Sequence, residues 1–166
     1  MIDLIEVLDN LIENALNDLY KKDYHLIQNK AKNEKGKDDA HHVGERAIVF
    51  RFAHYLLNYM DGTHLFGEYD LDCEYNRNGY KCKSLPSFPN GTLPDIIIHK
   101  RGSNEKNLMV IEFKTYWNKG KSVIEKDLSK LKEFTDIQGK YKFCKGYFIL
   151  IEKHREETTI RDCQNE

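Results

Sequence analysis

Two apolar stretches that are typical of neighbouring strands carry ionisable residues at the ends that would meet. Asp95 opens the stretch PDIIIHK, whereas Glu112 and Lys114 lie at the end of LMVIEFK. Successive strand side chains point to opposite faces, so Glu112 and Lys114 share one face and Phe113 points to the other. The turn-rich segment between the stretches predicts a hairpin. If that hairpin is centred on residues 103 and 104, Asp95 lies opposite Glu112.

The predicted pairing of these two acids favours metal chemistry. Like charges directly opposed across strands are unfavourable, and neither carboxylate would stay ionised beside the other without a compensating cation. Mg²⁺ or Mn²⁺ binds carboxylate oxygens together with waters and phosphate oxygens. Such a metal lowers the pKa of a bound water and offsets charge on a leaving oxygen. Lys114 is placed to steer the water or to hold the phosphate, so the pattern favours metal-dependent hydrolysis of a phosphodiester.

Three helices are predicted around these strands from the spacing of apolar residues. Residues 2–20 form an amphipathic helix whose apolar face is wide enough to pack on the core or on a second copy of the chain. A second helix is expected over residues 43–60, with Glu45 projecting from its apolar stripe at the N-terminal end. Ser122 and Glu125 have the spacing of a capping box, which predicts the start of a third helix.

The remaining stretches predict strands, turns and loops. An Asn-Gly pair at residues 78–79 lies between β-prone flanks and indicates a first hairpin, upstream of the one that carries the acids. Residues 141–151 are expected to form a last strand, followed by a polar tail from Glu152. Residues 29–42 are rich in lysine and predict a mobile surface loop. The order of elements predicts an α/β fold, with a mixed central sheet flanked by helices.

The motif PD at residues 94–95, followed by EFK at residues 112–114, resembles that of the PD-(D/E)XK, or restriction-endonuclease-like, nuclease superfamily. The resemblance spans about residues 43–151. It implies an α-β-β-β-α-β core, here with an extra N-terminal helix. It also implies a metal-dependent endonuclease of restriction, defence or repair, for which DNA is the favoured substrate over RNA. The segments DCEYNR, PDIIIHKRG and NLMVIEFK further resemble a group of small bacterial proteins of this superfamily.

The resemblance also implies a role for each matching residue. Asp95 and Glu112 correspond to metal ligands, and the backbone carbonyl of Phe113 would join them. Lys114 corresponds to the catalytic lysine. Glu45 corresponds to the accessory helical acid found in several branches of the superfamily, and would add a further ligand for Mg²⁺ or Mn²⁺.

Basic and aromatic residues outside the motif are candidates for contact with nucleic acid, each with an ordinary structural alternative. Aromatic faces stack on bases and lysines neutralise phosphates, but aromatics beside a strand end are also often part of a core. Asp127 lies on the inward half of the third helix, where an ordinary helix charge is favoured over contact with substrate or Lys114. Residues 99–101 are expected to be solvated. The candidates for nucleic-acid contact are Tyr116, Trp117, Lys119, Lys121, Arg77 and Lys130.

Length and composition bound the class of protein. The 166 residues suit a single domain, and the net charge of -1 gives no global basic field, so any nucleic-acid surface must be local. No apolar run is long enough for a membrane span, which predicts a cytoplasmic protein without membrane contact. The four cysteines lack zinc-site spacing and are too few for a disulfide scaffold, so reduced thiols are expected.

A second interpretation stays open beside the enzyme. The near-neutral charge and the wide apolar face of the first helix also suit a catalytically inactive member of the same fold, acting as a nucleic-acid-binding or protein-interaction subunit. A homodimer is favoured because cleavage of both strands of a duplex suits two-fold symmetry. The sequence leaves undecided whether DNA or RNA is bound and whether a specific nucleotide sequence is recognised.

Overall fold

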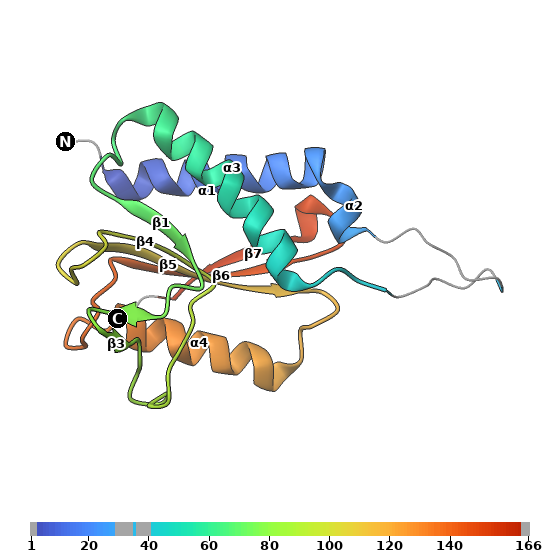
Figure 1. Cartoon of the computed structure of the whole chain (residues 1–166). Helices are drawn as coiled ribbons and strands as arrows, with labels where there is room; N and C mark the ends of the chain where they lie inside the picture. The colour runs from blue at the N-terminus through green and yellow to red at the C-terminus, as the bar shows by residue number, and fades with distance from the viewer. Residues whose placement is uncertain (1–2, 29–34, 36–40, 164–166) are drawn as a thin grey trace.

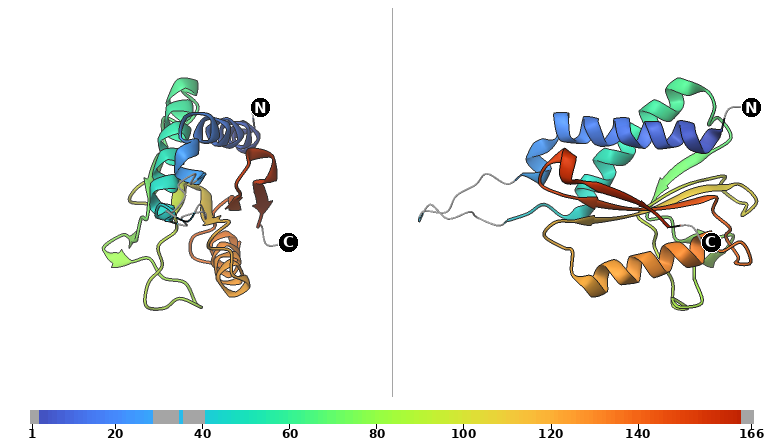
Figure 2. Two further views of the ribbon diagram at one scale, coloured as in Figure 1. Left: turned by 90° about the vertical axis from the view of Figure 1, so that its right-hand side faces the viewer. Right: turned by 180° about the vertical axis from the view of Figure 1, so that it is seen from behind.

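A five-stranded mixed sheet lies at the centre of the molecule, with helices on both of its faces (Figure 1). The computed structural model describes residues 3–28, 35 and 41–163. Seen end-on, helices and sheet form three layers (Figure 2). These features confirm the predicted α/β class with a mixed sheet flanked by helices. Most of the loop predicted over residues 29–42 lies outside the described residues.

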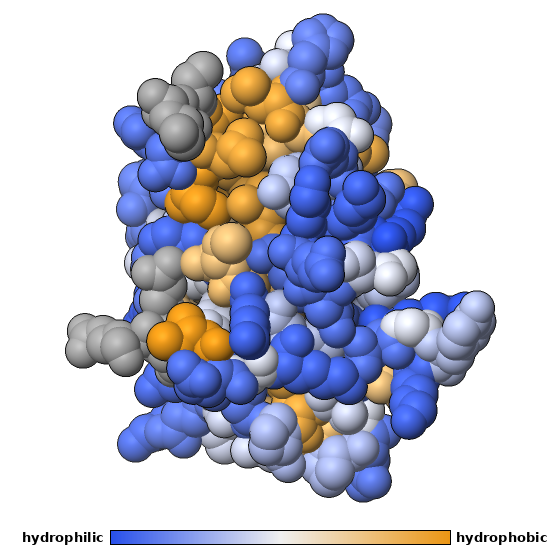
Figure 3. All heavy atoms as spheres, turned by 90° about the vertical axis from the view of Figure 1, so that its left-hand side faces the viewer, coloured by the Kyte–Doolittle hydropathy of each residue, from blue (hydrophilic) through white to orange (hydrophobic). Residues whose placement is uncertain are grey.

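One face of the sheet is covered by three helices, which are α1 (Leu4–Lys22), α2 (Tyr24–Ile27) and α3 (Glu45–Thr63). The carboxylate of Asp3 caps α1 by accepting a hydrogen bond from the Ile5 N–H at 2.9 Å. The apolar face of α1 is buried against α3 and the sheet, so this face packs on the core. Apolar side chains also reach the surface over this helical layer (Figure 3). Within the described residues, no helix combines the length and the apolar character that a membrane crossing requires.

The strands of the main sheet separate two halves of the core. In spatial order they are β1 (Asp70–Cys73), β4 (Ile96–His99), β5 (Asn107–Thr115), β6 (Lys145–Ile151) and β7 (Thr159–Asp162). Neighbouring strands are antiparallel except β5 and β6, which run parallel because a helical crossover connects them. Ile111 and Phe113 pack toward α1 and α3, whereas Val110 packs on the opposite face. The predicted hairpin of β4 and β5 is confirmed.

The opposite face of the sheet is covered by α4 (Lys121–Thr135), which connects β5 to β6. Leu131 and Phe134 of α4 are fully buried against this face. Gly146 of β6 allows the close approach, because a Cβ atom at this position would lie 2.9 Å from Cγ2 of Thr135. The position of α4 against the sheet therefore depends on a glycine in the strand.

The capping box predicted at Ser122 is wrong, and the last strand is shorter than predicted. Helix α4 begins at Lys121 after Gly120, whose extended backbone provides the helix boundary without any side-chain hydrogen bond. Ser122 therefore lies inside the first turn. Strand β6 begins only at Lys145, because Lys142 has a φ of 52° and interrupts the extended chain.

The first predicted hairpin and the polar tail also differ from expectation. The hairpin forms, but β2 (Arg77–Asn78) and β3 (Lys81–Cys82) make a separate two-stranded sheet. The chain leaves the main sheet at Glu74, where φ is 49°. The polar tail from Glu152 contains the 3₁₀ turn η1 (Arg155–Glu157) and the edge strand β7. Its few apolar residues were too short a pattern to predict a strand.

We expect Gly146→Ala to lower the free energy of unfolding by about 1–3 kcal/mol, because the new methyl group would overlap the side chain of Thr135. Urea denaturation of the whole chain measures the loss. Gly67→Ala is the matched control, since nothing lies within 4 Å of a Cβ atom there. Equal stability of the two variants would contradict the close packing of α4 on β6.

Candidate active site

The register of β4 and β5 places Asp95 opposite Glu112. Ile96 pairs with Ile111, so the next residues outward along the two chains face each other, as the hairpin symmetry predicted. Asp95 lies directly before β4, and its Oδ2 accepts a hydrogen bond from the backbone N–H of Phe113 at 2.7 Å. Both acids lie on the face of the sheet that α4 covers. Two carboxylates therefore share one end of the sheet.

The carboxylate of Glu112 is almost completely buried, with 1% of the residue exposed. Its Oε2 accepts a hydrogen bond from the ammonium of Lys130 at 2.8 Å, whereas its buried Oε1 has no hydrogen-bond partner. Burial, together with the negative charge of Asp95, raises the pKa of Glu112 well above its ordinary value. Burial likewise raises the pKa of Asp95 to about 6. Each acid therefore resists ionisation.

Lys114 lies at the centre of the site and connects three elements. Its ammonium donates to the backbone carbonyl of Phe113 at 2.6 Å and to Oε1 of Glu45 at 3.0 Å. It also forms an ion pair with Oδ2 of Asp127 at 2.9 Å. Burial lowers the pKa of Lys114, but the contacts with Asp127 and Glu45 more than offset this effect and hold the pKa above its ordinary value. Lys114 is thus a fixed positive charge.

The predicted helical acid, Glu45, does reach the site. It is the first residue of α3, and Figure 1 shows this end of the helix close to the end of β5. One of its carboxylate oxygens contacts Lys114, and the other is buried without a hydrogen-bond partner. Glu45 therefore adds a third carboxylate from the helical layer opposite α4.

Asp127 was predicted to be an ordinary helix charge, but it is part of the site. It is buried on α4 and bridges two lysines, with Oδ1 at 2.7 Å from Nζ of Lys130 and Oδ2 at 2.9 Å from Nζ of Lys114. Lys130 is held within this network, and its predicted contact with nucleic acid stays a prediction. The position of Lys130, three residues after Asp127 on the inward face of the helix, was the sequence signal that could have predicted their contact.

The four acids carry more negative charge than the two lysines offset. Glu45, Asp95, Glu112 and Asp127 provide four carboxylates, and Lys114 and Lys130 provide two ammonium groups. When all six groups are ionised, the excess is two negative charges, which a divalent cation would balance. The oxygens of Glu45 and Glu112 that lack hydrogen-bond partners are hard donors of the kind that Mg²⁺ and Mn²⁺ prefer.

The lysines hold the acids in an arrangement that is not a metal cluster. Within residues 3–28, 35 and 41–163, no group of three or more His, Cys, Asp or Glu side chains is arranged to hold a metal ion. A Mg²⁺ site usually needs only one or two carboxylates, with waters completing the shell. Asp95, Glu112 and the carbonyl of Phe113 provide such a set once Lys114 releases that carbonyl.

Two cavities border the site and give access to it. One, of about 200 Å³, is lined by Asp95 together with Arg46 and Glu74. The other, of about 370 Å³, lies beside α4 and is lined by Lys126 and Lys130. Asp95 and Lys130 therefore each line a cavity, whereas Glu112, Lys114 and Asp127 line neither of these two.

The aromatic segment after β5 packs on the core. Tyr116 and Trp117 lie partly buried against the α1 and α3 side, and the Tyr116 hydroxyl donates to the carbonyl of Ile27 at 3.3 Å. The Trp117 ring stacks on His42, with ring centroids 4.2 Å apart. These contacts agree with the structural alternative, in which both aromatics are part of the core. Lys119 pairs with Glu152, and Lys121 is exposed, so their contact with nucleic acid stays a prediction.

Residues at the far end of β4 form a separate group. His99 was expected to be solvated, but it is buried, and its Nε2 lies 2.9 Å from Oδ2 of Asp72. Burial lowers the pKa of His99. The expectation failed because β1 covers this edge of β4 and supplies an acid there. Arg77 lines a cavity beside His99 and does not join the site at Asp95.

In metal-free buffer we expect Asp95→Asn to stabilise the protein at neutral and higher pH. The pKa of Asp95 rises from 3.8 to about 6 on folding, so the wild type loses stability as the pH rises through this range. The variant cannot ionise and should be more stable by about 1–3 kcal/mol near pH 8, with the difference vanishing near pH 4. Urea denaturation across this range, with the exposed Asp61→Asn as control, measures it. If Asp95→Asn were less stable than the wild type near pH 8, the raised pKa of Asp95 would be refuted.

Comparison of the chain with protein-family models gives no match, and comparison with curated proteins gives no match either. The geometry described above is therefore the basis for assigning a function. Its parts are two opposed acids, a fixed lysine, a helical acid from each face of the sheet and an excess of negative charge. These parts come from three layers of the fold and meet at one sheet end.

Proposed function

We propose that this protein is a metal-dependent nuclease that hydrolyses phosphodiester bonds, with its reaction centre at Asp95, Glu112 and Lys114. The observation that carries the proposal is a buried Glu112 opposite a partly buried Asp95, within a group of four acids whose charge exceeds that of the two neighbouring lysines. Burying unbalanced charge costs several kcal/mol, and clusters of perturbed ionisable groups are frequent at functional sites. A bound divalent cation removes this cost.

The metal ligands in this proposal are the carboxylates of Asp95 and Glu112 and the carbonyl of Phe113, with Glu45 as an accessory acid. The bound Mg²⁺ or Mn²⁺ supplies a water of lowered pKa and an offset for charge on the leaving oxygen. The Phe113 N–H holds Asp95 in place, and Lys130 holds one oxygen of Glu112. The protein thus fixes the two carboxylates before any ligand arrives.

Lys114 is the residue that acts on the phosphate. When it leaves the Phe113 carbonyl, its ammonium can donate to a phosphate oxygen or orient the attacking water. The contact with Asp127 keeps the ammonium charged and limits its movement to one side of the site. Asp127 is therefore a positioning residue for Lys114.

The order of elements supports the same assignment. Along the chain, α3, β1, β4, β5, α4 and β6 succeed one another in the α-β-β-β-α-β order that the PD-(D/E)XK resemblance implies, with the β2 and β3 hairpin inserted. In this proposal the substrate is DNA, and a homodimer would present one site to each strand of a duplex.

A second candidate is a non-catalytic subunit of the same fold. The specific observation in its favour is that Lys114 and Lys130 already bind three of the four acids. Such a network also describes a purely structural ion cluster. The two candidates differ in one property, because only the enzyme must exchange lysine contacts for a divalent cation.

We expect calorimetric titration with Mn²⁺ to show saturable binding that Glu112→Gln weakens at least about tenfold, because this change removes a buried charged ligand. Affinity should rise between about pH 6 and pH 8, since a metal competes with protons on acids of raised pKa. Glu125→Gln, an exposed acid on the outer side of α4, is the matched control. Absence of binding at millimolar Mn²⁺ would favour the non-catalytic candidate.

We expect Lys114→Met to lower the rate of Mn²⁺-dependent cleavage of duplex DNA by about 10²-fold or more, while Mn²⁺ binding persists. Lys145→Met, at the opposite end of the sheet, should retain full activity. Lys114→Arg keeps the charge that Glu45 and Asp127 require, and so separates a catalytic loss from unfolding. Wild-type cleavage rates in both folded Lys114 variants would rule out the assigned role.

A further inference from the structure

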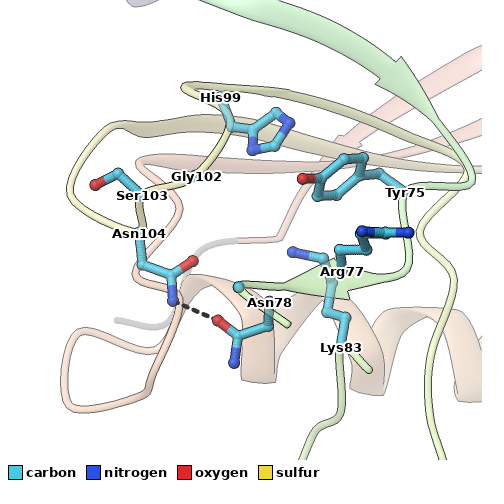
Figure 4. A pocket seen from close by; sticks show the side chains of 9 residues that line it. Tyr75, Arg77, Asn78, Lys83, His99, Gly102, Ser103 and Asn104 are labelled. Atoms are coloured by element: carbon cyan, nitrogen blue, oxygen red, sulfur yellow. Dashed lines mark hydrogen bonds between the residues drawn. The ribbon is translucent and has the colours of Figure 1, made fainter. Parts of the chain in front are cut away.

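A cavity of about 220 Å³ lies at the other end of β4 from Asp95 (Figure 4). It is enclosed by the β2 and β3 hairpin, by the turn between β4 and β5, and by the side chain of His99. Because β4 contains four residues, the cavity and the acids are about 13 Å apart along the strand. It is therefore separate from the proposed reaction centre.

Lys83 presents an ammonium group to this cavity from a buried position. The residue is 2% exposed, and within the described part of the chain it forms no ion pair or hydrogen bond through its ammonium. Its Nζ lies over three aromatic rings instead, 4.6 Å from the centroid of Tyr141, 5.6 Å from Tyr75 and 5.9 Å from Phe143. Burial lowers the pKa of Lys83 to about 8, and the charge of Lys140 acts in the same direction. A buried cation without an anion is unfavourable.

The rest of the cavity wall supplies further donors and no acid. Arg77 and the hydroxyl of Ser103 line it, and Figure 4 shows the Asn104 amide joined to Asn78 by a hydrogen bond of 2.8 Å. This bond ties the hairpin to the turn between β4 and β5. None of the described residues that line the cavity is an aspartate or a glutamate.

The carboxylate next to His99, that of Asp72, already has partners. Asp72 accepts from Arg101 at 2.8 Å and contacts His99 at 2.9 Å. Its charge is thereby balanced away from Lys83. The cavity thus combines a buried lysine, an arginine and neutral donors, which is the chemistry that receives an anion.

We propose that this cavity binds a phosphate group, with Lys83 as its buried counter-ion and Arg77 as a second donor. The volume admits a phosphate with part of the group that carries it. The phosphate can belong to a free small phosphorylated molecule or to the phosphorylated end of a nucleic acid. The proposal is independent of the metal site and stands if the chain is not a nuclease.

Tyr80 distinguishes these two sources. It lies at the tip of the hairpin, next to Gly79 of the cavity wall, and its side chain is fully exposed. An exposed aromatic ring beside a phosphate site offers a stacking surface for a base. Tyr80→Ala should therefore weaken binding of a 5′-phosphorylated oligonucleotide and leave binding of inorganic phosphate unchanged.

The test is calorimetric titration of the whole chain, without divalent metal and with a chelator present. The probes are inorganic phosphate, adenosine monophosphate, and one oligonucleotide in 5′-phosphorylated and 5′-hydroxyl forms. We expect Lys83→Met to weaken phosphate binding by about ten- to a hundredfold, as for loss of a charged hydrogen bond. Methionine suits the aromatic surroundings, so the fold should persist. Lys81→Met, an exposed lysine of the same hairpin, is the control, and Arg77→Gln is a second, exposed variant at the cavity.

The outcomes separate clearly. Binding that Lys83→Met and Arg77→Gln weaken, and Lys81→Met does not, supports the site. If the 5′-phosphorylated oligonucleotide binds more tightly than both its hydroxyl form and inorganic phosphate, the ligand is a nucleic-acid end. If inorganic phosphate binds as tightly as the phosphorylated oligonucleotide, the ligand is a small molecule. No saturable binding of any probe at millimolar concentration, or equal binding by the wild type and Lys83→Met, overturns the proposal. Because the chelator removes divalent metal, the titration does not depend on the metal site.

Discussion

The burial of Asp95 beside Glu112 is the constraint on which the rest of the site depends. Glu112 is almost completely buried, and the negative charge of Asp95 adds to the free-energy cost of ionising it. Two lysines from different elements offset part of that cost. Lys114 comes from β5 and Lys130 from α4, and both are held by Asp127. The charge network thus joins the sheet to α4, and through Glu45 it also joins α3.

This arrangement gives Lys114 two incompatible sets of partners. In the structure it binds the carbonyl of Phe113, which the proposed metal also requires. Buried ion pairs add little net stability, but they are costly to break without replacement. In the proposed reaction centre a divalent cation would be such a replacement, because it would neutralise the acids and free the lysine to contact a phosphate. The contacts that stabilise the acids without a ligand would then set the free-energy cost that metal binding must exceed.

The register of the acids could be predicted from the sequence because it depends on local geometry. A short turn and period-two alternation determine which residues of β4 and β5 face each other, so the pairing of Asp95 with Glu112 followed from the hairpin alone. Asp127 could not be placed in the same way. Its contacts depend on how α4 packs on the sheet, and Gly146, which lies beyond the helix in the chain, permits the close approach of the end of α4. Long-range packing of this kind leaves no local pattern.

The burial of Lys83 also could not be predicted from the local sequence. A lysine after a polar hairpin is normally solvated, and its burial results from Tyr141 and Phe143, which are nearly sixty residues away in sequence. These aromatics were predicted to belong to the last strand. They instead precede it, because the left-handed backbone at Lys142 turns the chain and directs both rings toward α4 and the hairpin. A single backbone conformation thus shortens β6 and places two aromatic rings beside Lys83.

The two ends of β4 have opposite electrostatic character on the same face of the sheet. Asp95 lies at one end within an excess of negative charge, and His99 lies at the other beside the lysine and arginine of the cavity. Ile97, between them, is fully buried and separates the two. A strand of four residues keeps this spacing rigid, because its backbone is hydrogen-bonded to β1 and to β5. On the two proposals above, a polyanion carrying divalent cations would match both ends at once, with the cation at the acids and a phosphate at Lys83. The polarity of one short strand would then fix the direction in which such a chain lies across the sheet.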